Sequence, residues 1–295
     1  MMLAALGDIH GNYTALETTL TWAKDNGITH LAFLGDYVTD CPYPRRTMRL
    51  LYEAQNAFET VFIRGNREDY MLGLAATADT SPGDTLPAFY GSRMGNIFST
   101  YAHLSPDDIA FFAALPISTR VEYENAPALR LCHGSLDNNR TVVRPDRPSM
   151  AETLAALDTD FLLCAHSHLQ FLYRDPRTGK TVINGGSVGH PCREKTTNAE
   201  FVVLTLENGT WSAQLHSLPY DIRAAVRDFD GSDFLREAGV WARAVRQTLL
   251  TGKNMTYAVL VTVARLRTEQ HLPDNLSPTE EEPLWEAAPE ILGIP

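Results

Sequence analysis

Apolar and polar segments alternate regularly over the first seventy residues of this 295-residue chain. The three apolar runs, each ending in a turn that carries Asp or Asn, are 3–8, 28–36 and 59–66. The segments between them, 12–25 and 44–56, have the spacing of amphipathic helices, and Asn12 is well placed as a helix N-cap. Strand, helix, strand, helix, strand predicts parallel pairing with right-handed crossovers.

The pattern changes further along the chain. Residues 71–104 are rich in Gly, Ala, Ser, Thr and Pro, which predicts a loop-rich insertion near the site, and Ser105 then caps a helix. Seven short apolar segments follow, and they predict a second, mostly hairpin-connected sheet that packs on the first. These segments are 117–123, 128–134, 161–166, 170–175, 180–185, 200–206 and 211–218.

The last quarter of the chain returns to helical spacing. We predict a helical C-terminal extension at 221–295 on a main domain of residues 1–220, and only weak structure in the acidic tail after Leu272. The apolar positions of this extension favour core packing or self-association over a membrane helix.

Composition and charge exclude several classes of protein. The chain is 44% hydrophobic and 21% charged, as in ordinary globular proteins. Without an apolar run of eighteen residues or a signal-like N-terminus, we expect a cytoplasmic protein. The net charge of -11 works against non-specific binding to nucleic acid or anionic membranes. The four cysteines lack paired spacing, so we expect free thiols.

Side chains suited to metal ligation gather where the predicted strands end. They are Asp8, His10, Asp36, Asn66, His133, His166 and His168. All seven offer oxygen or imidazole donors, which suit first-row divalent metals. One ion rarely needs seven donors, whereas two ions that share a carboxylate do. Such a pair clamps the attacking and leaving oxygens of a phosphoryl displacement.

The ordered motifs D-x-H-G-N, G-D, G-N, H-G and H-x-H, followed by NGGSVG, resemble the calcineurin-like metallophosphoesterase superfamily. Within it, the chain is similar to the compact bacterial and archaeal phosphoesterases. The resemblance covers roughly residues 1–217 and is specific because every motif is present in order. It implies an α/β fold, a four-layer α-β-β-α sandwich, to which the C-terminal helical extension is added.

The resemblance also assigns the seven donors to two ions. It implies one ion held by Asp8, His10 and His168, another held by Asn66, His133 and His166, and Asp36 as the bridge. Two divalent ions bring four positive charges, and two carboxylates and a bridging hydroxide remove three, so the site would attract a phosphate group. The hydroxide would then attack phosphorus. Mn, Fe, Zn, Ni and Co all suit these ligands.

Arg67 departs from the family pattern. Many members carry a histidine at this position, which is thought to protonate the leaving oxygen. An arginine, with a pKa above about 12, cannot do so at neutral pH but can stabilise charge on phosphate. We therefore expect a dinuclear phosphoesterase that slightly prefers phosphodiester or nucleotide-type substrates over monoesters, with Asp36, Asn66, Arg67 and His133 as its catalytic residues.

Arg67 is one candidate substrate contact. Others come from the stretch NGGSVG and the residues just after it, which lie beside the metals in the family; they are Asn184, Ser187, His190 and Arg193. A plain glycine-rich turn is the alternative interpretation of this stretch. Asp40, close after the bridging aspartate, fits a solvated loop or a substrate contact, and Glu68 fits a helix start, where acids suit the dipole.

Two other functions stay open. The first is a phosphomonoesterase, including protein phosphatase or dinucleoside polyphosphate hydrolase activity. The second is a non-catalytic metal or nucleotide sensor that keeps the ligands and turns nothing over.

Overall fold

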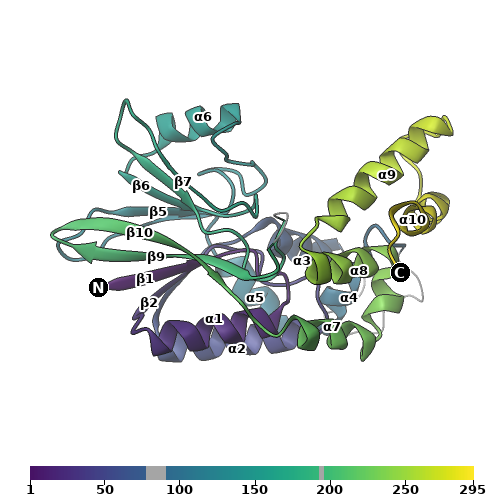
Figure 1. Cartoon of the computed structure of the whole chain (residues 1–295), viewed down its shortest axis with the longest axis horizontal. Helices are drawn as coiled ribbons and strands as arrows, with labels where there is room; N and C mark the ends of the chain where they lie inside the picture. The colour runs from purple at the N-terminus through teal and green to yellow at the C-terminus, as the bar shows by residue number, and fades with distance from the viewer. Residues whose placement is uncertain (78–90, 193–195) are drawn as a thin grey trace.

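The computed structural model describes residues 1–77, 91–192 and 196–295. Two five-stranded sheets pack face to face, with helices against both outer faces (Figure 1). From top to bottom in Figure 1 the layers are α6 (Pro148–Ala156), the second sheet, the first sheet, and the pair α1 (Tyr13–Asp25) and α2 (Pro44–Ala57). The predicted four-layer α-β-β-α sandwich is confirmed.

The first sheet has the strand order β10-β9-β1-β2-β3. Its strands are β1 (Met2–Leu6), β2 (His30–Phe33), β3 (Glu59–Phe62), β9 (Ala199–Glu207) and β10 (Thr210–Leu218). The first three are parallel, as predicted, and β9 pairs antiparallel with β1. Placing β9 and β10 in the second sheet was wrong. Their turn reveals only that they pair with each other, not which sheet the hairpin joins.

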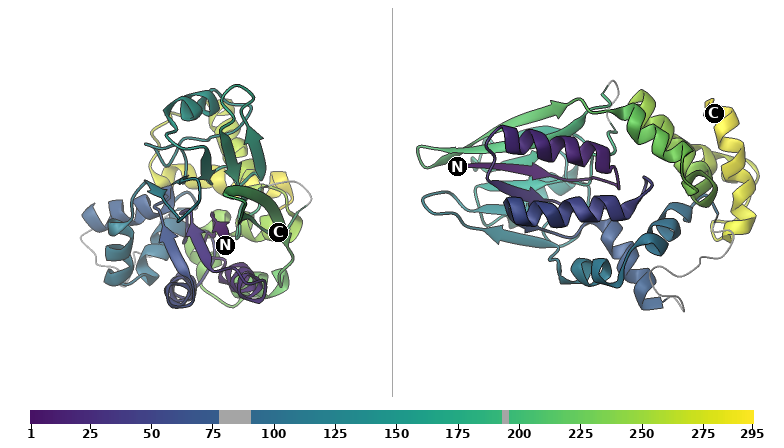
Figure 2. Two further views of the ribbon diagram at one scale, coloured as in Figure 1. Left: turned by 90° about the vertical axis from the view of Figure 1, so that its left-hand side faces the viewer. Right: turned by 90° about the horizontal axis from the view of Figure 1, so that it is seen from below.

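The helices of the first half follow their sequence signals. The Asn12 side chain accepts a hydrogen bond from the backbone N–H of Ala15 at 3.1 Å and caps α1, as predicted. Leu16 on this helix is buried against the sheet. Figure 2 shows α1 and α2 side by side across the sheet. This layer leaves the carboxyl ends of β1, β2 and β3 free to carry loops.

The second sheet has the order β4-β5-β6-β8-β7. Its strands are β4 (Ser118–Val121), β5 (Leu129–Cys132), β6 (Phe161–Cys164), β7 (Phe171–Arg174) and β8 (Thr181–Asn184). The pairs β5–β6 and β6–β8 are parallel, so the expectation of a mostly hairpin-connected sheet was wrong. Parallel neighbours need a crossover, and the unpredicted helix α6 supplies it between β5 and β6.

The two faces of each strand pack into different cores. Leu3 and Ala5 of β1 lie between the sheets with Leu163 of β6, whereas Ala4 and Leu6 lie under the helices. This alternation is the period of two expected of a strand covered on both faces. The sandwich is therefore held on both sides of its central strands.

The loop-rich insertion expected at 71–104 needs correction. Helix α3 (Asn66–Thr77) and helix α4 (Gly95–His103) occupy much of it, and 78–90 lies outside the described residues. A Cβ on Gly95 would collide with the backbone of Glu237 on α8 (Phe234–Thr251). Burial against a distant helix overrides weak local propensity here. Helix α5 (Pro106–Ala114) follows with the predicted Ser105 cap.

Four helices form the described C-terminal extension. They are α7 (Ile222–Asp230), α8, α9 (Met255–Glu269) and α10 (Pro278–Leu292). The tail expected to be weakly structured is helical in α10, because a capping box of Ser277 and Glu280 starts it and buried Trp285 anchors it. Among the described residues, the apolar cluster of these helices includes buried Cys41 and partly buried Tyr220 from the main domain. The domain boundary at 220 stays a prediction.

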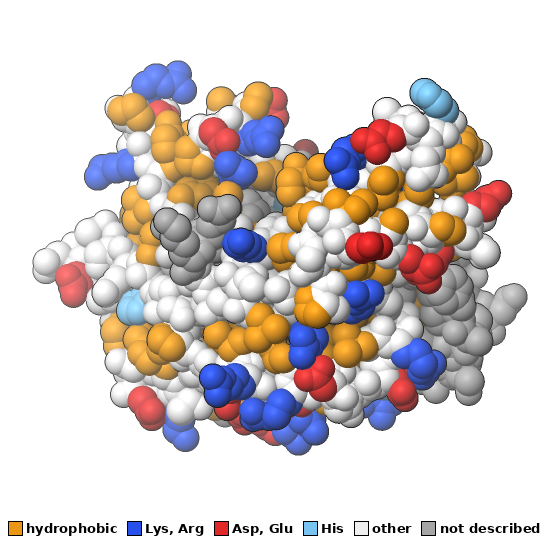
Figure 3. Space-filling model, turned by 45° about the vertical axis from the view of Figure 1, so that its right-hand side comes forward, with side chains coloured by type: hydrophobic (Ala, Val, Ile, Leu, Met, Phe, Trp, Pro, Cys, Tyr) orange, Lys and Arg blue, Asp and Glu red, His pale blue; other side chains and the backbone are white. Residues whose placement is uncertain are grey.

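The outer surface of α9 exposes large apolar side chains, among them Tyr257, Leu260 and Val261. Figure 3 shows hydrophobic side chains over this region of the face. Among the described helices, none is both long and apolar enough to cross a membrane. Self-association through the C-terminal helices and a cytoplasmic location stay predictions.

Cys41, Cys132 and Cys164 are buried free thiols, and Cys192 is a partly exposed one.

Candidate metal centre

The seven predicted ligands lie at the carboxyl ends of strands from both sheets. Asp8 and His10 follow β1, Asp36 follows β2, and Asn66 begins α3 after β3. The second sheet contributes His133 after β5, and His166 and His168 after β6. The two sheets face each other so that these loops meet at one edge. The structure brings all seven side chains together there.

Short distances join these side chains into one cluster. Nε2 of His10 lies 3.1 Å from Nε2 of His168, and Oδ1 of Asp8 lies 3.5 Å from the same His168 atom. Asp36 lies between the two halves, with Oδ2 3.7 Å from Nε2 of His10 and Oδ1 3.4 Å from Nε2 of His133. A shared carboxylate between two sets of donors is the geometry that the resemblance implies for a bridge.

The remaining two donors complete the second half of the cluster. Oδ1 of Asn66 lies 3.3 Å from Nε2 of His133. Asp36, His133 and His166 form a group whose ligand atoms all lie within 4.8 Å of one another. The donors on this side are thus one amide oxygen, one carboxylate and two imidazoles.

Five of the seven predicted ligands have left-handed backbone conformations. They are Asp8, His10, Asp36, His166 and His168, with φ between 52° and 65°. Each such conformation costs a non-glycine residue roughly 1–2 kcal/mol. The strain is concentrated in the loops that carry the donors, which indicates that the site geometry, not local stability, determines these turns.

Glycines let the two central loops approach each other. Gly35 has a φ of 89°, and a Cβ on it would collide with the backbone of Gly65. A Cβ on Gly65 would in turn collide with the backbone N and the carboxylate of Asp36. Only residues without side chains fit this contact. It places Asp36 beside the loop that carries Asn66.

The donor set fits divalent cations. Asp8 is fully buried, and neither carboxylate oxygen has a hydrogen-bond partner among the described residues. An unpartnered buried carboxylate is costly unless a cation compensates it. Nδ1 of His133 donates to the carbonyl of Leu34 at 2.7 Å, and Nδ1 of His168 donates to the carbonyl of His190 at 2.6 Å. These hydrogen bonds leave the Nε2 atoms of both rings for a metal.

The charges of the cluster are strongly coupled. Burial opposes ionisation of Asp36, but the neighbouring His133 and His10 hold its pKa well below its usual range. Burial lowers the pKa of His133, but Asp36 and Asp8 raise it to about 9. Burial likewise opposes protonation of His168, whose pKa Asp8 and Cys192 raise to about 10. Protons thus compensate the carboxylates where cations would otherwise do so.

Sequence reasoning missed the role of Glu68. Its buried carboxylate accepts hydrogen bonds from the backbone N–H groups of Asp36 (2.9 Å), Tyr37 (2.8 Å) and Gly65 (2.9 Å). Burial and the neighbouring Asp36 raise the pKa of Glu68 to about 7. Glu68 does lie in the first turn of α3, but its side chain joins the loops after β2 and β3.

Sequence reasoning also missed the environment of Asp40, which is fully buried and is not part of a solvated loop. Its Oδ2 lies 2.9 Å from Nδ1 of His10 and 3.2 Å from Nη2 of Arg67. Burial opposes ionisation, but Arg67 and His10 hold the pKa of Asp40 well below its usual range. Nothing in the local sequence signals this, because Arg67 stands 27 residues away.

The predicted substrate residues occupy different environments. Asn184 is fully buried and donates to the carbonyl of Ala165 at 2.7 Å, and fully buried Ser187 donates to the carbonyl of Asp8 at 2.8 Å. His190 is buried close to the cluster, and its Nε2 has no hydrogen-bond partner in the described part of the chain. Arg193 lies outside the described residues.

Arg67 lies at the edge of the cluster. Its Nε is 3.9 Å from Oδ2 of Asp36, and 18% of its side chain is exposed. Burial disfavours the charged form, but Asp40 and Asp36 together raise the pKa of Arg67 above its ordinary value. The guanidinium is therefore a fixed positive charge beside the carboxylate of Asp36.

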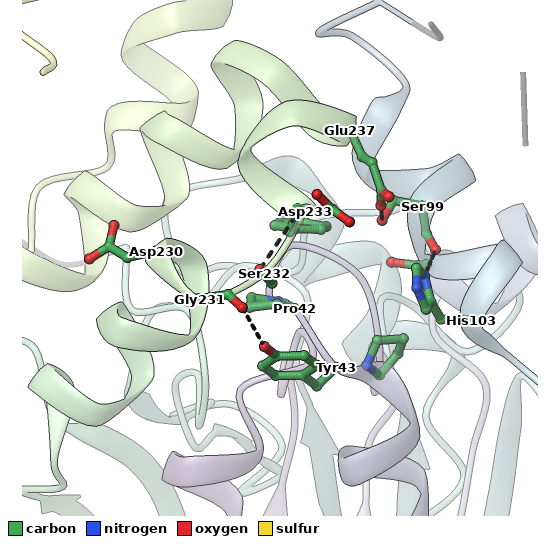
Figure 4. Close-up of a pocket in the computed structure, with 12 residues that line it drawn as sticks. Pro42, Tyr43, Ser99, His103, Asp230, Gly231, Ser232, Asp233 and Glu237 are labelled. Atoms are coloured by element: carbon green, nitrogen blue, oxygen red, sulfur yellow. Dashed lines mark hydrogen bonds between the residues drawn. The ribbon is translucent and has the colours of Figure 1, made fainter. Parts of the chain in front are cut away.

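Two cavities lie around this end of the molecule. One of about 600 Å³ is lined by the predicted ligand His166 together with Arg144 and Arg147. Another, of about 510 Å³, lies between the start of α2, helix α4 and the α7–α8 turn (Figure 4). None of the seven predicted ligands lines this second cavity, and the Tyr43 hydroxyl donates to the carbonyl of Gly231 at its edge.

Fold and site together define a protein of the metallophosphoesterase class. The family model for calcineurin-like phosphoesterases matches residues 1–170, more than half of the chain, and the chain therefore belongs to this family.

Solved structures agree on the fold. A metallophosphoesterase from Sphaerobacter thermophilus is 20% identical with a TM-score of 0.65, covering 85% of this chain and 99% of its own. A hypothetical protein from Pyrococcus horikoshii is also 20% identical, with a TM-score of 0.69, covering 85% of this chain and 98% of its own. No curated protein matches this chain.

Proposed function

We propose that this protein is a dinuclear metal-dependent phosphoesterase that hydrolyses P–O bonds, with phosphodiester or nucleotide-type substrates slightly preferred over monoesters. The observation that carries the proposal is the buried carboxylate of Asp8, whose oxygens have no hydrogen-bond partner among the described residues, beside six further donors. Family membership supports the phosphate-ester class of substrate.

The chain's own residues have distinct tasks in this proposal. Asp8, His10 and His168 would hold one ion, Asn66, His133 and His166 the other, and Asp36 both. Bound divalent ions would supply Lewis acidity and bring the pKa of water near neutrality. Because Asn66 is uncharged, it offers a ligand oxygen without cancelling the positive charge that attracts phosphate.

Arg67 underlies the proposed substrate preference. Its guanidinium stays charged because Asp40 and Asp36 raise its pKa, so it cannot protonate a leaving oxygen. It can neutralise charge on a phosphate that reaches the cluster. Substrates with good leaving groups should therefore react faster than alkyl monoesters.

On the substrate side we propose His190 as a contact, because its Nε2 has no hydrogen-bond partner among the described residues and its ring lies beside His10 and His168. For Asn184 and Ser187 we propose a supporting role. Ser187 Oγ accepts from the backbone N–H of His190 at 2.8 Å, which fixes the loop that carries this histidine. Arg193 stays a predicted substrate contact.

The test combines metal analysis with hydrolysis. Purified protein should bind about two equivalents of a divalent metal and hydrolyse bis(p-nitrophenyl) phosphate. The Asp36→Ala variant should not hydrolyse this substrate. Less than one equivalent of metal, with none taken up on addition, would contradict the dinuclear site. Metal and nucleotide binding without hydrolysis above the Asp36→Ala background would favour the sensor.

The role of Arg67 has its own test. Arg67→His supplies a group that can donate a proton, so the rate on an alkyl monoester such as glycerol 2-phosphate should rise relative to the rate on p-nitrophenyl phosphate, whose leaving group needs no proton. Arg67→Lys is the control, because it keeps a positive charge without a titratable proton near neutral pH. An unchanged ratio of rates in Arg67→His would contradict the leaving-group argument.

A further inference from the structure

A tryptophan of the C-terminal extension contacts a carboxylate that lies behind the proposed metal ligands. Trp241 lies on α8, and its indole Nε1 donates a hydrogen bond to Oδ1 of Asp40 at 2.8 Å. The two residues are 201 positions apart, and both are buried. This contact therefore ties the extension directly to a carboxylate behind the proposed ligands.

The two oxygens of Asp40 face different parts of the molecule. Oδ1 accepts from Nε1 of Trp241 and from Nδ2 of Asn96 on α4 at 2.6 Å. Oδ2 lies 2.9 Å from Nδ1 of His10 and 3.2 Å from Nη2 of Arg67. Helices α4 and α8 thus fix one oxygen, and the other is presented to a ligand and to the cation at the cluster edge.

Trp241 also contacts Arg67 directly. The guanidinium carbon lies 5.9 Å from the centroid of the indole ring, within the range of a cation–π interaction. The same indole therefore touches both partners of the Asp40–Arg67 ion pair. A change at Trp241 should alter the orientation of both.

We propose that Trp241 is a positioning residue of the metal centre, which acts through Asp40 to orient His10 and Arg67. The proposal rests on the proposed metal-dependent function and makes the extension part of the site. A carboxylate beside the second nitrogen of a metal-binding histidine sets the ring orientation, and changes to such groups typically cost about 10–100-fold in metal affinity or activity.

The test compares two tryptophans of one cluster. Trp241→Phe keeps an aromatic ring but removes the N–H. Trp285→Phe is the matched control, because Trp285 lies in the same apolar cluster, 6.3 Å from Trp241 between ring centroids, and donates to Glu281 at 3.0 Å. Mn²⁺ affinity by calorimetry, the visible spectrum of the Co²⁺-loaded protein, and the guanidinium unfolding midpoint are measured for each.

We expect Trp241→Phe to weaken Mn²⁺ binding about tenfold, which is the lower end of the range for changes to groups behind a metal ligand. The visible spectrum of the Co²⁺-loaded protein should also change. Trp285→Phe should leave the Mn²⁺ affinity and the Co²⁺ spectrum close to wild type, even when its unfolding midpoint falls as far as that of Trp241→Phe. On bis(p-nitrophenyl) phosphate, Trp241→Phe should raise KM as well as lower kcat, because Arg67 moves with it.

Unchanged Mn²⁺ affinity and Co²⁺ spectrum in Trp241→Phe would overturn the proposal, and so would equal changes in both variants. Should Trp241→Phe fail to fold, Asn96→Ala removes the other donor to Oδ1 of Asp40 and must show the same loss of affinity. The metal readouts need no turnover. A wild-type protein that binds metal but hydrolyses nothing would refute the proposed function and still test the role of Trp241.

Discussion

Replacement of Glu68 by Gln tests how the site loops are held together. The carboxylate of Glu68 accepts three backbone N–H groups, those of Asp36 and Gly65 at Oε2 and that of Tyr37 at Oε1. Gln has the same shape but only one acceptor oxygen. In its best orientation the amide oxygen serves Asp36 and Gly65, and the amide N–H₂ group then faces the N–H of Tyr37.

The free energy can be worked from these contacts. A buried donor left without a partner costs about 1–3 kcal/mol, and hydrogen bonds to a charged group exceed neutral ones by about 1 kcal/mol. Relief of a buried charge beside Asp36 offsets part of this loss. We therefore expect Glu68→Gln to lower the free energy of unfolding by about 2–4 kcal/mol.

The assay is guanidinium unfolding in EDTA, followed by fluorescence and circular dichroism. A lower midpoint at an unchanged slope reports a loss of stability. Asp107→Asn is the matched control, because Asp107 is an exposed acid in the first turn of α5 and loses only its interaction with the helix dipole. That loss is about 0.3–1 kcal/mol.

Equal losses in the two variants would refute the reasoning. Glu68 would then act only as an acid at a helix start, as its sequence position suggests. A large loss in Glu68→Gln with a small one in Asp107→Asn supports a structural bridge between the loops after β2 and β3.

Three further outcomes are expected. Gly65→Ala places a Cβ against the backbone N and the carboxylate of Asp36. The Mn²⁺ affinity measured by calorimetry should therefore fall at least about tenfold. An affinity equal to that of the wild-type protein would contradict the close contact. Because the pKa values of His133 and His168 are raised to about 9 and about 10, both rings hold protons near neutrality that a metal must displace. Apparent Mn²⁺ affinity should therefore rise between about pH 6 and about pH 8 with release of protons, and binding independent of pH and buffer would count against this coupling. Asp8→Ala removes both carboxylate oxygens, so the rise of the unfolding midpoint with added metal should be smaller than in the wild-type protein, and a rise equal to that of the wild type would count against Asp8 as a ligand.

Some parts of the fold could be predicted because their signals are local. The Asn12 cap and the order of the first three strands follow from apolar spacing and turn residues within a few positions of each other. The same local signals could not place β9 and β10, because an antiparallel hairpin satisfies its own pairing in either sheet. Helix α10 was missed because its acidic surface masks the buried face that contains Trp285.

The sequence alone determined which donors are available and where they stand. Each of the seven predicted ligands follows an apolar run that is a strand in the structure, and the carboxyl ends of those strands are where loops can converge. For the loops after β1, β2 and β3 this convergence follows from the parallel strands that the sequence predicts. For His133 and His166 it depends on the parallel pairing of β5 with β6, which the sequence did not predict.

Only the tertiary structure decided what holds those donors in place. Glu68 joins two loops through backbone N–H groups, and backbone hydrogen bonding leaves no mark on residue choice at Asp36 or Tyr37. Asp40 meets Trp241 across 201 residues, because the extension folds back over the main domain. The identity of an Asp or Glu does not reveal whether its carboxylate is buried or solvated, because burial depends on packing between segments that are distant in the sequence.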